Sequence, residues 1–145
     1  MLYQANSLGF KVAAICAGHY PLLDQAKAAC HIFHQQTLNR TGDDKLIAYV
    51  FTGYELVGDL YPFAGDRAAY WETSLLMALD PGMVDLTVLP PTMEGVFGVG
   101  GHRPPHEANA EDGEQYVQKI VERVGVKVKK RLEKHGDFRA HHLPL

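Results

Sequence analysis

Short apolar runs and an amphipathic stretch alternate along the first third of the chain. Phe10–Ala17 (FKVAAICA) and Leu46–Phe51 (LIAYVF) are nearly continuous apolar runs, typical of strands buried on both faces of a parallel sheet. From Leu22 to Thr37 apolar residues recur at helical spacing, which predicts a helix with Pro21 in its first turn. The order strand, helix, strand indicates a βαβ unit. We therefore expect an α/β fold with a mainly parallel sheet and flanking helices.

A helical segment is predicted before the first strand. Met1–Leu8 carries several apolar residues, and Gly9 follows where a helix C-terminal glycine is expected. The chain therefore begins, on this pattern, inside a helix-to-strand connection. After the long helix, residues 41–44 (TGDD) are expected to form a turn.

The middle of the chain combines irregular segments with one predicted helix. Residues 53–68 are rich in glycine, tyrosine and acidic groups and show no clear period, so we expect a long functional loop. Ala69–Leu79 is predicted to be helical, and Met83–Leu89 is predicted to be a short strand. Residues 90–109 are rich in proline and glycine and are expected to form a loop.

The last helix has the clearest pattern. Asn109 can cap it, acidic residues follow at its positive end, and an apolar stripe runs from Val117 to Leu132. Gly125 costs this helix about 1 kcal/mol relative to alanine, and nothing in the sequence explains it. Basic residues gather near the C-terminal end; a solvated face is favoured over phosphate binding for them. These are Lys127, Lys129, Lys130, Arg131 and Lys134.

Composition narrows the class of protein. A length of 145 residues corresponds to a single domain, and 46% hydrophobic with 21% charged residues is typical of globular proteins. A net charge of −3 provides no basic field for nucleic acid. Two cysteines, Cys16 and Cys30, cannot build a disulfide framework and indicate a reducing compartment. No apolar run approaches the ~18 residues that span a bilayer, and no signal-peptide pattern begins the chain, so we expect a cytoplasmic protein without a membrane partner.

Histidine is frequent, with eight copies, and His19 is the strongest candidate for chemistry. It follows Gly18 at the carboxyl end of the first predicted strand, which is where α/β sheets bind ligands. An unligated loop histidine is the equally weighted alternative. His31 and His34 have a spacing that can bind metal, but a surface pair is favoured. The others rate lower, with loop or tail positions expected for His102, His106, His141 and His142.

Glu72 is the second candidate. It shares a helical face with three leucines, so its carboxylate is expected to point inward, where it must be paired, bind metal or be protonated. Asp66 and Arg67 are its expected partners. The alternative is a helix N-terminal residue that interacts with the helix dipole, with Thr73 and Ser74 facing solvent.

The segment Gly65–Leu86 (GDRAAYWETSLLMALDPGMVDL) resembles the signature of the creatininase (creatinine amidohydrolase) family. That family also has a glycine-histidine pair after a buried strand, as in Ala17–Tyr20 (AGHY). Gly95–Gly98 and Ala108–Glu133 are similar to the family's glycine-rich loop and closing helix. The resemblance covers nearly the whole chain, and Glu72-Thr73-Ser74 is its most specific part.

The resemblance implies a metal-dependent hydrolase. Family members use one or two divalent ions, usually zinc or manganese, to hold a hydroxide that attacks the carbonyl of a small, often cyclic, amide. His19 falls on a metal-ligand position, and Glu72 on the acidic position, as ligand or base. Asp66 and Arg67 join Glu72 as candidate catalytic residues. Substrate contacts are expected from Tyr20, Tyr54, Trp71 and His102.

The chain departs from the family pattern at several points. Arg67 stands where the family usually has a proton-donating histidine, and Pro21 and Leu22 stand where relatives have a further metal ligand. Residues 1–18 contain no counterpart of the family's upstream glutamate, histidine and bridging aspartate. The resemblance therefore implies the C-terminal part of a creatininase-like domain, without its N-terminal half, in a homo-oligomer. A catalytically inactive structural or interaction module is the alternative, and phosphate binding at the βαβ turn is weaker because that turn lacks a glycine-rich loop.

Overall fold

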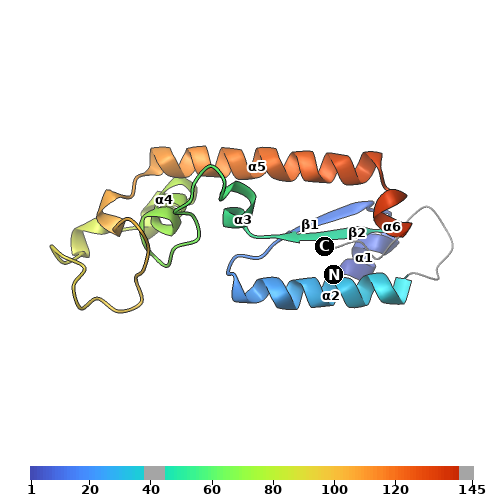
Figure 1. Ribbon diagram of the computed structural model, residues 1–145, viewed down its shortest axis with the longest axis horizontal. Coiled ribbons are helices and arrows are strands. Elements are labelled where there is room, and N and C mark those ends of the chain that lie inside the picture. The colour runs from blue at the N-terminus through green and yellow to red at the C-terminus, as the bar shows by residue number, and fades with distance from the viewer. Residues whose placement is uncertain (38–44, 141–145) are drawn as a thin grey trace. The chain divides into compact units, whose positions relative to one another are not determined.

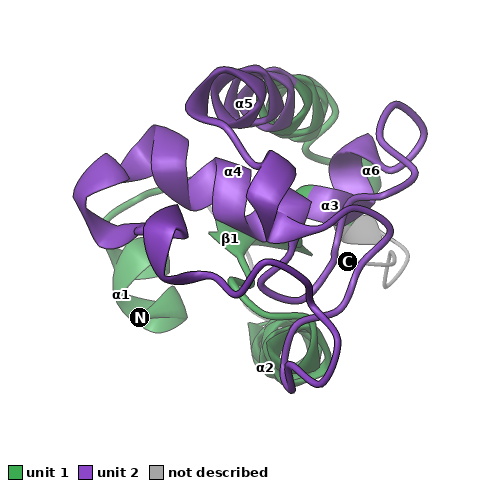
Figure 2. Ribbon diagram, turned by 90° about the vertical axis from the view of Figure 1, so that its left-hand side faces the viewer, with its two compact units in different colours: residues 1–53, 123–145 green, residues 54–122 purple. Residues whose placement is uncertain are grey.

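A computed structural model describes residues 1–37 and 45–140 of the chain. The expected turn at 41–44, together with His141 and His142, lies outside the described residues. The chain divides into two compact units (Figure 2). Unit 1 comprises residues 1–53 and 123–145, and unit 2 comprises residues 54–122.

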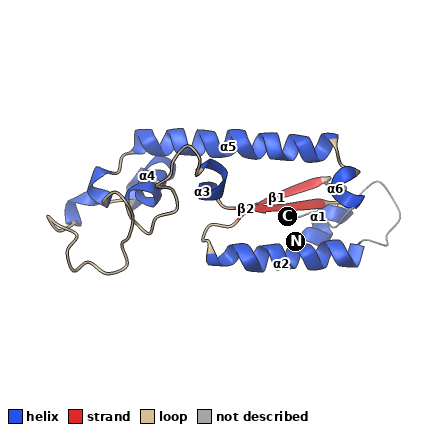
Figure 3. Cartoon of the chain, in the orientation of Figure 1, coloured by secondary structure: helices blue, strands red, loops and turns tan. Residues whose placement is uncertain are grey.

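Unit 1 contains the predicted βαβ arrangement. It begins with α1 (Leu2–Ser7), followed by β1 (Val12–Cys16), α2 (Pro21–Thr37) and β2 (Ile47–Phe51). The two strands pair in parallel in a two-stranded sheet (Figure 3). The expectation of an α/β fold with parallel strands joined by a helix is thereby confirmed. Gly9 follows α1 with a φ of +82°, as the predicted C-terminal glycine.

The two strands differ in burial. Every residue of β2 is buried, as its apolar pattern predicts. In β1, however, Ala14 and Cys16 are exposed, so the expectation of burial on both faces is wrong for this strand. One face of the sheet packs on α2, whereas on the opposite face of β1 Ala14 and Cys16 are exposed and Val12 is half-buried. The buried cluster against α2 comprises Ala17, Leu23, Cys30, Ala48 and Val50.

Unit 2 is built from short helices and ordered loops. The expected loop at 53–68 begins with a helix, α3 (Gly53–Val57), and the next helix, α4 (Tyr70–Leu79), matches its prediction. The strand expected at Met83–Leu89 is wrong, because 3₁₀ helices occupy Pro81–Met83 and Leu86–Val88. Asp85 favours the second of these, since its carboxylate accepts the backbone N–H of Thr87 at 2.9 Å. A third 3₁₀ helix lies at 105–107.

The longest helix is α5 (Ala110–Glu133), which begins in unit 2 and ends in unit 1 (Figure 1). Asn109 caps it as predicted, with its Oδ1 accepting the Asp112 N–H at 2.9 Å. Arg131 departs from the expected solvated face, because it is only 7% exposed and its guanidinium lies 4.0 Å from the Tyr49 ring centroid. A short helix, α6 (Asp137–Ala140), follows α5. No helix within the described ranges combines the length and apolar character needed to cross a bilayer.

Candidate functional site

Reciprocal hydrogen bonds hold the residues that precede α4. The Asp66 carboxylate accepts the backbone N–H groups of Trp71 (2.6 Å) and Glu72 (3.1 Å), which have no intrahelical partner in the first turn. In the opposite direction, Glu72 Oε2 accepts the backbone N–H of Ala68 at 2.7 Å. This arrangement resembles a capping box, with Asp66 serving as the capping side chain. It ties the loop to the start of α4.

Glu72 is exposed, so the expectation that its carboxylate points inward is wrong. Leu76 and Leu79, which were expected to mark an inward face, are themselves 42% and 68% exposed. The structure confirms the alternative for Glu72, a residue that interacts with the helix N-terminus. Ser74 does not face solvent as that alternative assumed, because it is fully buried and its Oγ accepts the Asn109 N–H at 3.2 Å.

Arg67 belongs to a backbone contact between the two loops of unit 2. It forms an antiparallel bridge with Gly100, with N···O distances of 2.7 and 2.9 Å, while its side chain is exposed. The neighbouring Gly101 permits this approach, because a Cβ there would lie 2.8 Å from the Cβ of Asp66 and 2.9 Å from that of Ala69. The glycine-rich loop is thus packed directly against the Asp66 segment.

The backbone between Arg67 and Glu72 is strained. Ala68 has a φ of +47°, the left-handed region that costs a non-glycine residue about 1 kcal/mol or more. The Ala68 N–H bond to Glu72 and the Arg67 bridge on its other side offset this cost. Backbone strain of this kind clusters at functional sites, so it is a second observation that favours a functional role for this segment.

The expected substrate contacts in unit 2 lie in different settings. Trp71 is only 2% exposed and stacks on Tyr116 with ring centroids 4.3 Å apart, so its indole belongs to the interior. Tyr54 is half-buried, and its ring lies where a Cβ on Gly65 would come within 2.9 Å of its Cγ. His102 is exposed in the glycine-rich loop.

His19 and Tyr20 lie in unit 1 and are both exposed. Their rings meet edge to face with centroids 5.1 Å apart. Just before them, the Ala17 N–H donates to the Phe51 carbonyl at 2.8 Å and joins the ends of β1 and β2. His19 therefore follows the carboxyl ends of two parallel strands, the edge at which α/β sheets bind ligands.

Of the remaining candidate histidines, His34 and His106 contact backbone groups, and His31 is exposed. His34 is half-buried, and its Nε2 accepts the backbone N–H of Ala48 at 3.0 Å. The expected surface pair with His31 is therefore wrong for His34, while His31 is exposed. His106 lies 2.8 Å from the carbonyl oxygen of Pro90. Burial, and secondarily the charge of His31, lowers the pKa of His34 below its usual value.

The described residues do not by themselves form the metal site that the family resemblance implies. Within 1–37 and 45–140, no three or more histidine, cysteine or acidic side chains are grouped so that they could hold a metal ion. His19 belongs to unit 1 and Glu72 to unit 2. Both oxygens of Asp66 and one oxygen of Glu72 already accept backbone N–H groups. A catalytic zinc site uses three protein ligands, and this donor set does not fit that requirement.

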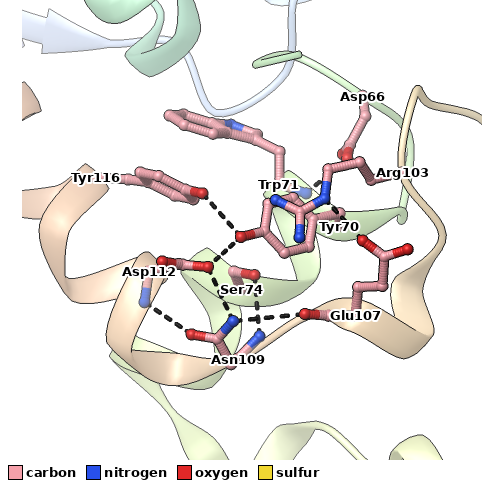
Figure 4. Close-up of polar contacts among 9 residues, drawn as sticks. All are labelled: Asp66, Tyr70, Trp71, Ser74, Arg103, Glu107, Asn109, Asp112 and Tyr116. Atoms are coloured by element: carbon pink, nitrogen blue, oxygen red, sulfur yellow. Dashed lines mark hydrogen bonds and ion pairs between the residues drawn. The ribbon is translucent and has the colours of Figure 1, made fainter. Parts of the chain in front are cut away.

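A polar network that sequence reasoning missed joins the start of α5 to α4 (Figure 4). The Tyr70 hydroxyl donates to the Asp112 carboxylate and accepts from the Tyr116 hydroxyl at 3.2 Å. Asn109 Nδ2 donates to the same Asp112 carboxylate at 2.9 Å. These donors, the Tyr70 hydroxyl first and the Asn109 amide second, lower the pKa of Asp112. Burial raises the pKa of Tyr116, which stays a neutral donor.

Arg103, from the glycine-rich loop, packs on this network. Its guanidinium carbon lies 3.5 Å from the Tyr70 ring centroid, in cation–π contact, and its Nε donates to Glu107 at 2.8 Å (Figure 4). The Arg103 carbonyl also accepts the Tyr70 backbone N–H at 3.3 Å. Sequence reasoning identified only Asn109 as a cap, since Tyr70 and Asp112 are 42 residues apart and no local pattern links them.

Comparisons with protein-family models, with curated proteins and with solved structures find no match to this chain.

Proposed function

We propose that this chain acts in hydrolysis of a C–N bond in a small cyclic amide or a related ring compound, as in the creatininase family that Gly65–Leu86 resembles. One observation carries the proposal. Ala68, strained with a positive φ, follows the exposed Arg67 and donates its backbone N–H to the Glu72 carboxylate. The backbone N–H of Glu72 in turn donates to the Asp66 carboxylate. A short segment thus presents a cation and a carboxylate at one helix start. The proposed setting is cytoplasmic.

The residues of this segment suit separate tasks. In amide hydrolysis, the oxygen of water bonds to the carbonyl carbon, the C–N bond breaks, and a proton passes to the nitrogen. We assign that proton transfer to the Glu72 carboxylate, which is exposed and has one oxygen without a backbone donor in the contacts described. The exposed guanidinium of Arg67 is assigned to stabilise the carbonyl oxygen as that atom becomes negative. Asp66 is a positioning residue, because both of its oxygens hold the helix start.

The metal in this proposal comes from the family resemblance. The resemblance implies zinc or manganese, with His19 as one ligand, but the described side chains do not complete a site. His19 can serve in this way because it is exposed at the end of β1 and nothing lies within 4 Å of a Cβ at Gly18.

A hydrolysis assay tests this function. Creatinine and other small cyclic amides are supplied with the chain and added zinc or manganese, and ring opening is followed by chromatography. Glu72→Gln keeps an oxygen for the Ala68 N–H but loses the proton carrier, so we expect turnover to fall by about 10²-fold or more without loss of stability. Glu114→Gln, an exposed acid on α5, is the matched control. Absence of turnover on every ring substrate, or turnover that Glu72→Gln leaves unchanged, contradicts the proposal.

A second candidate is an interaction module without catalysis. The hydrogen bonds at the start of α4 favour it, because they use Asp66 and Glu72 as structural caps. The exposed Ala14 and Cys16 of β1 favour it as well. Under this alternative, added metal ions do not bind at His19, and His19→Ala behaves like His31→Ala in zinc titration calorimetry. Zinc binding that His19→Ala abolishes and His31→Ala retains would exclude it.

A further inference from the structure

Along each strand of the unit 1 sheet, backbone N–H and C=O groups point alternately toward the other strand and toward the outer edge. The Ile47 N–H donates to the Lys11 carbonyl at 2.9 Å, and the Ala17 N–H donates to the Phe51 carbonyl at 2.8 Å. In a parallel ladder, alternate residues direct their backbone groups to the same neighbour. The odd-numbered residues of both strands therefore bond across the sheet. The even-numbered residues direct their N–H and C=O groups to the outer edges.

Side chains close the outer edge of β2. The backbone N–H of Leu46 donates to Asn6 Oδ1 at 2.8 Å, and that of Ala48 donates to His34 Nε2 at 3.0 Å. Asn6 comes from α1 and His34 from α2, so two helices each contribute one cap. An incoming strand would have to displace both side chains to pair with this edge.

None of the residues that the structure describes caps the outer edge of β1 in this way. In the described part of the chain the sheet has only two strands, so no third strand pairs with β1. The residues whose backbone N–H and C=O groups point to this edge are Val12, Ala14 and Cys16. Ala14 and Cys16 are exposed. The strand contains neither a charged residue nor a proline, the usual means by which proteins block an edge. Within the described residues, side chains thus cap the outer edge of β2, whereas no strand or side-chain cap meets the outer edge of β1.

We propose that β1 pairs antiparallel with β1 of a second copy of this chain, about a two-fold axis at Ala14. In this register, Ala14 faces Ala14 of the partner subunit, and Val12 faces Cys16 of the partner subunit. Every outward N–H and C=O of the strand then meets a complementary group, because all of these are hydrogen-bonding positions. No like charges oppose each other across the axis, and isologous two-fold contacts are the commonest in homo-oligomers. This interface goes beyond the proposed hydrolysis and needs neither metal nor substrate.

Sedimentation equilibrium of the full chain tests the interface. The wild-type chain is expected to be a dimer. Ala14→Lys places a charge at the axis and is expected to give a monomer of unchanged circular dichroism. Ile32→Lys is the matched control, because Ile32 is 55% exposed on α2 and lies outside the strand; it should remain dimeric. A wild-type monomer at all concentrations, or a dimer that Ala14→Lys leaves intact, overturns the proposal.

Cross-linking tests the register independently of any loss of folding. Directly opposite residues at hydrogen-bonding positions have Cα atoms about 5.5 Å apart, within the range of a disulfide. Ala14→Cys in a Cys16→Ser background should therefore give a covalent dimer on mild oxidation. Cys16 in the wild-type chain should not, because the two copies of Cys16 would lie about 13 Å apart along the strands. Cross-linking through Cys16, or its absence at Ala14→Cys, overturns this register.

Discussion

The imidazole of His34 accepts the backbone N–H of Ala48 through Nε2, at 3.0 Å. This bond joins α2 to the outer edge of β2 and requires the neutral ring, because a protonated imidazole has no acceptor. Burial, followed by the charge of His31, lowers the pKa of His34 in the folded chain. The His34 side chain therefore caps one position of this sheet edge and links the stability of unit 1 to pH.

The first prediction concerns acid stability. Since the folded pKa of His34 lies below its unfolded value, its contribution is fully present above the unfolded value of about 6.5 and is lost as pH falls through the folded pKa. Urea unfolding of the wild-type chain should show a falling free energy of unfolding between pH 7.5 and 5. His34→Gln should flatten this slope, whereas the exposed His31→Gln should keep most of it. Equal slopes in all three proteins would contradict the assignment.

The second prediction concerns the cap of α4. Asp66→Ala leaves the N–H groups of Trp71 and Glu72 without their acceptor, so it should lower the free energy of unfolding by about 1–2 kcal/mol. Thermal denaturation measures this change. Glu94→Ala, at an exposed loop carboxylate, should be neutral within about 0.5 kcal/mol. A loss no larger than that of Glu94→Ala would show that Asp66 does not hold the helix start.

The third prediction compares two glycines of α5. A Cβ on Gly113 would collide with the Ser74 carbonyl oxygen and lie 2.9 Å from the Cβ of Ala78, whereas Gly125 has nothing within 4 Å. Gly113→Ala should therefore destabilise the chain, by about 1–3 kcal/mol as overpacking does. Gly125→Ala should stabilise it by about 0.5–1 kcal/mol, because a helix-interior glycine is replaced in open space. Chemical denaturation of both variants measures these opposite signs, and a shared sign would contradict the packing described.

The fourth prediction concerns the buried tyrosine network. Tyr70→Phe removes the donor to Asp112 and the acceptor of Tyr116, so it should cost about 1–3 kcal/mol of stability. Tyr116→Phe removes only one donor and should cost less. The Asp112 pKa is lowered in the folded chain, so its contribution is present at neutral pH and is lost as pH falls through the folded pKa. Tyr70→Phe should weaken this acid sensitivity, and an unchanged pH profile in urea unfolding would argue against the network.

Much of the fold follows from local pattern. The apolar runs and the helical spacing predict β1, α2 and β2, because period and length are properties of neighbouring residues. Asn109 likewise marks the start of α5, since its side chain bonds only three residues ahead. The short strand expected at Met83–Leu89 failed for a local reason too, because Asp85 and the preceding proline-glycine pair favour 3₁₀ turns.

The candidate site was predicted in part. Asp66, Arg67 and Glu72 were named together from their positions in one segment, and one hydrogen bond does connect two of them, from the Glu72 backbone N–H to the Asp66 carboxylate. The orientation of Glu72 was not predictable from the leucines that share its face, because the capping bonds at the helix start and the packing of α4 set which side faces solvent. Burial of a helix face depends on what packs against it.

By itself, the sequence determined the βαβ order, the parallel pairing that follows from it, the long closing helix and the positions of the candidate side chains. Only the tertiary structure decided that Asn6 and His34 cap the edge of β2, while no described strand pairs with the other edge of β1, and that Tyr70 reaches Asp112. The physical reason is that periodicity and capping act over a few residues. Hydrogen bonds between residues about 40 apart in the chain depend on how whole elements pack.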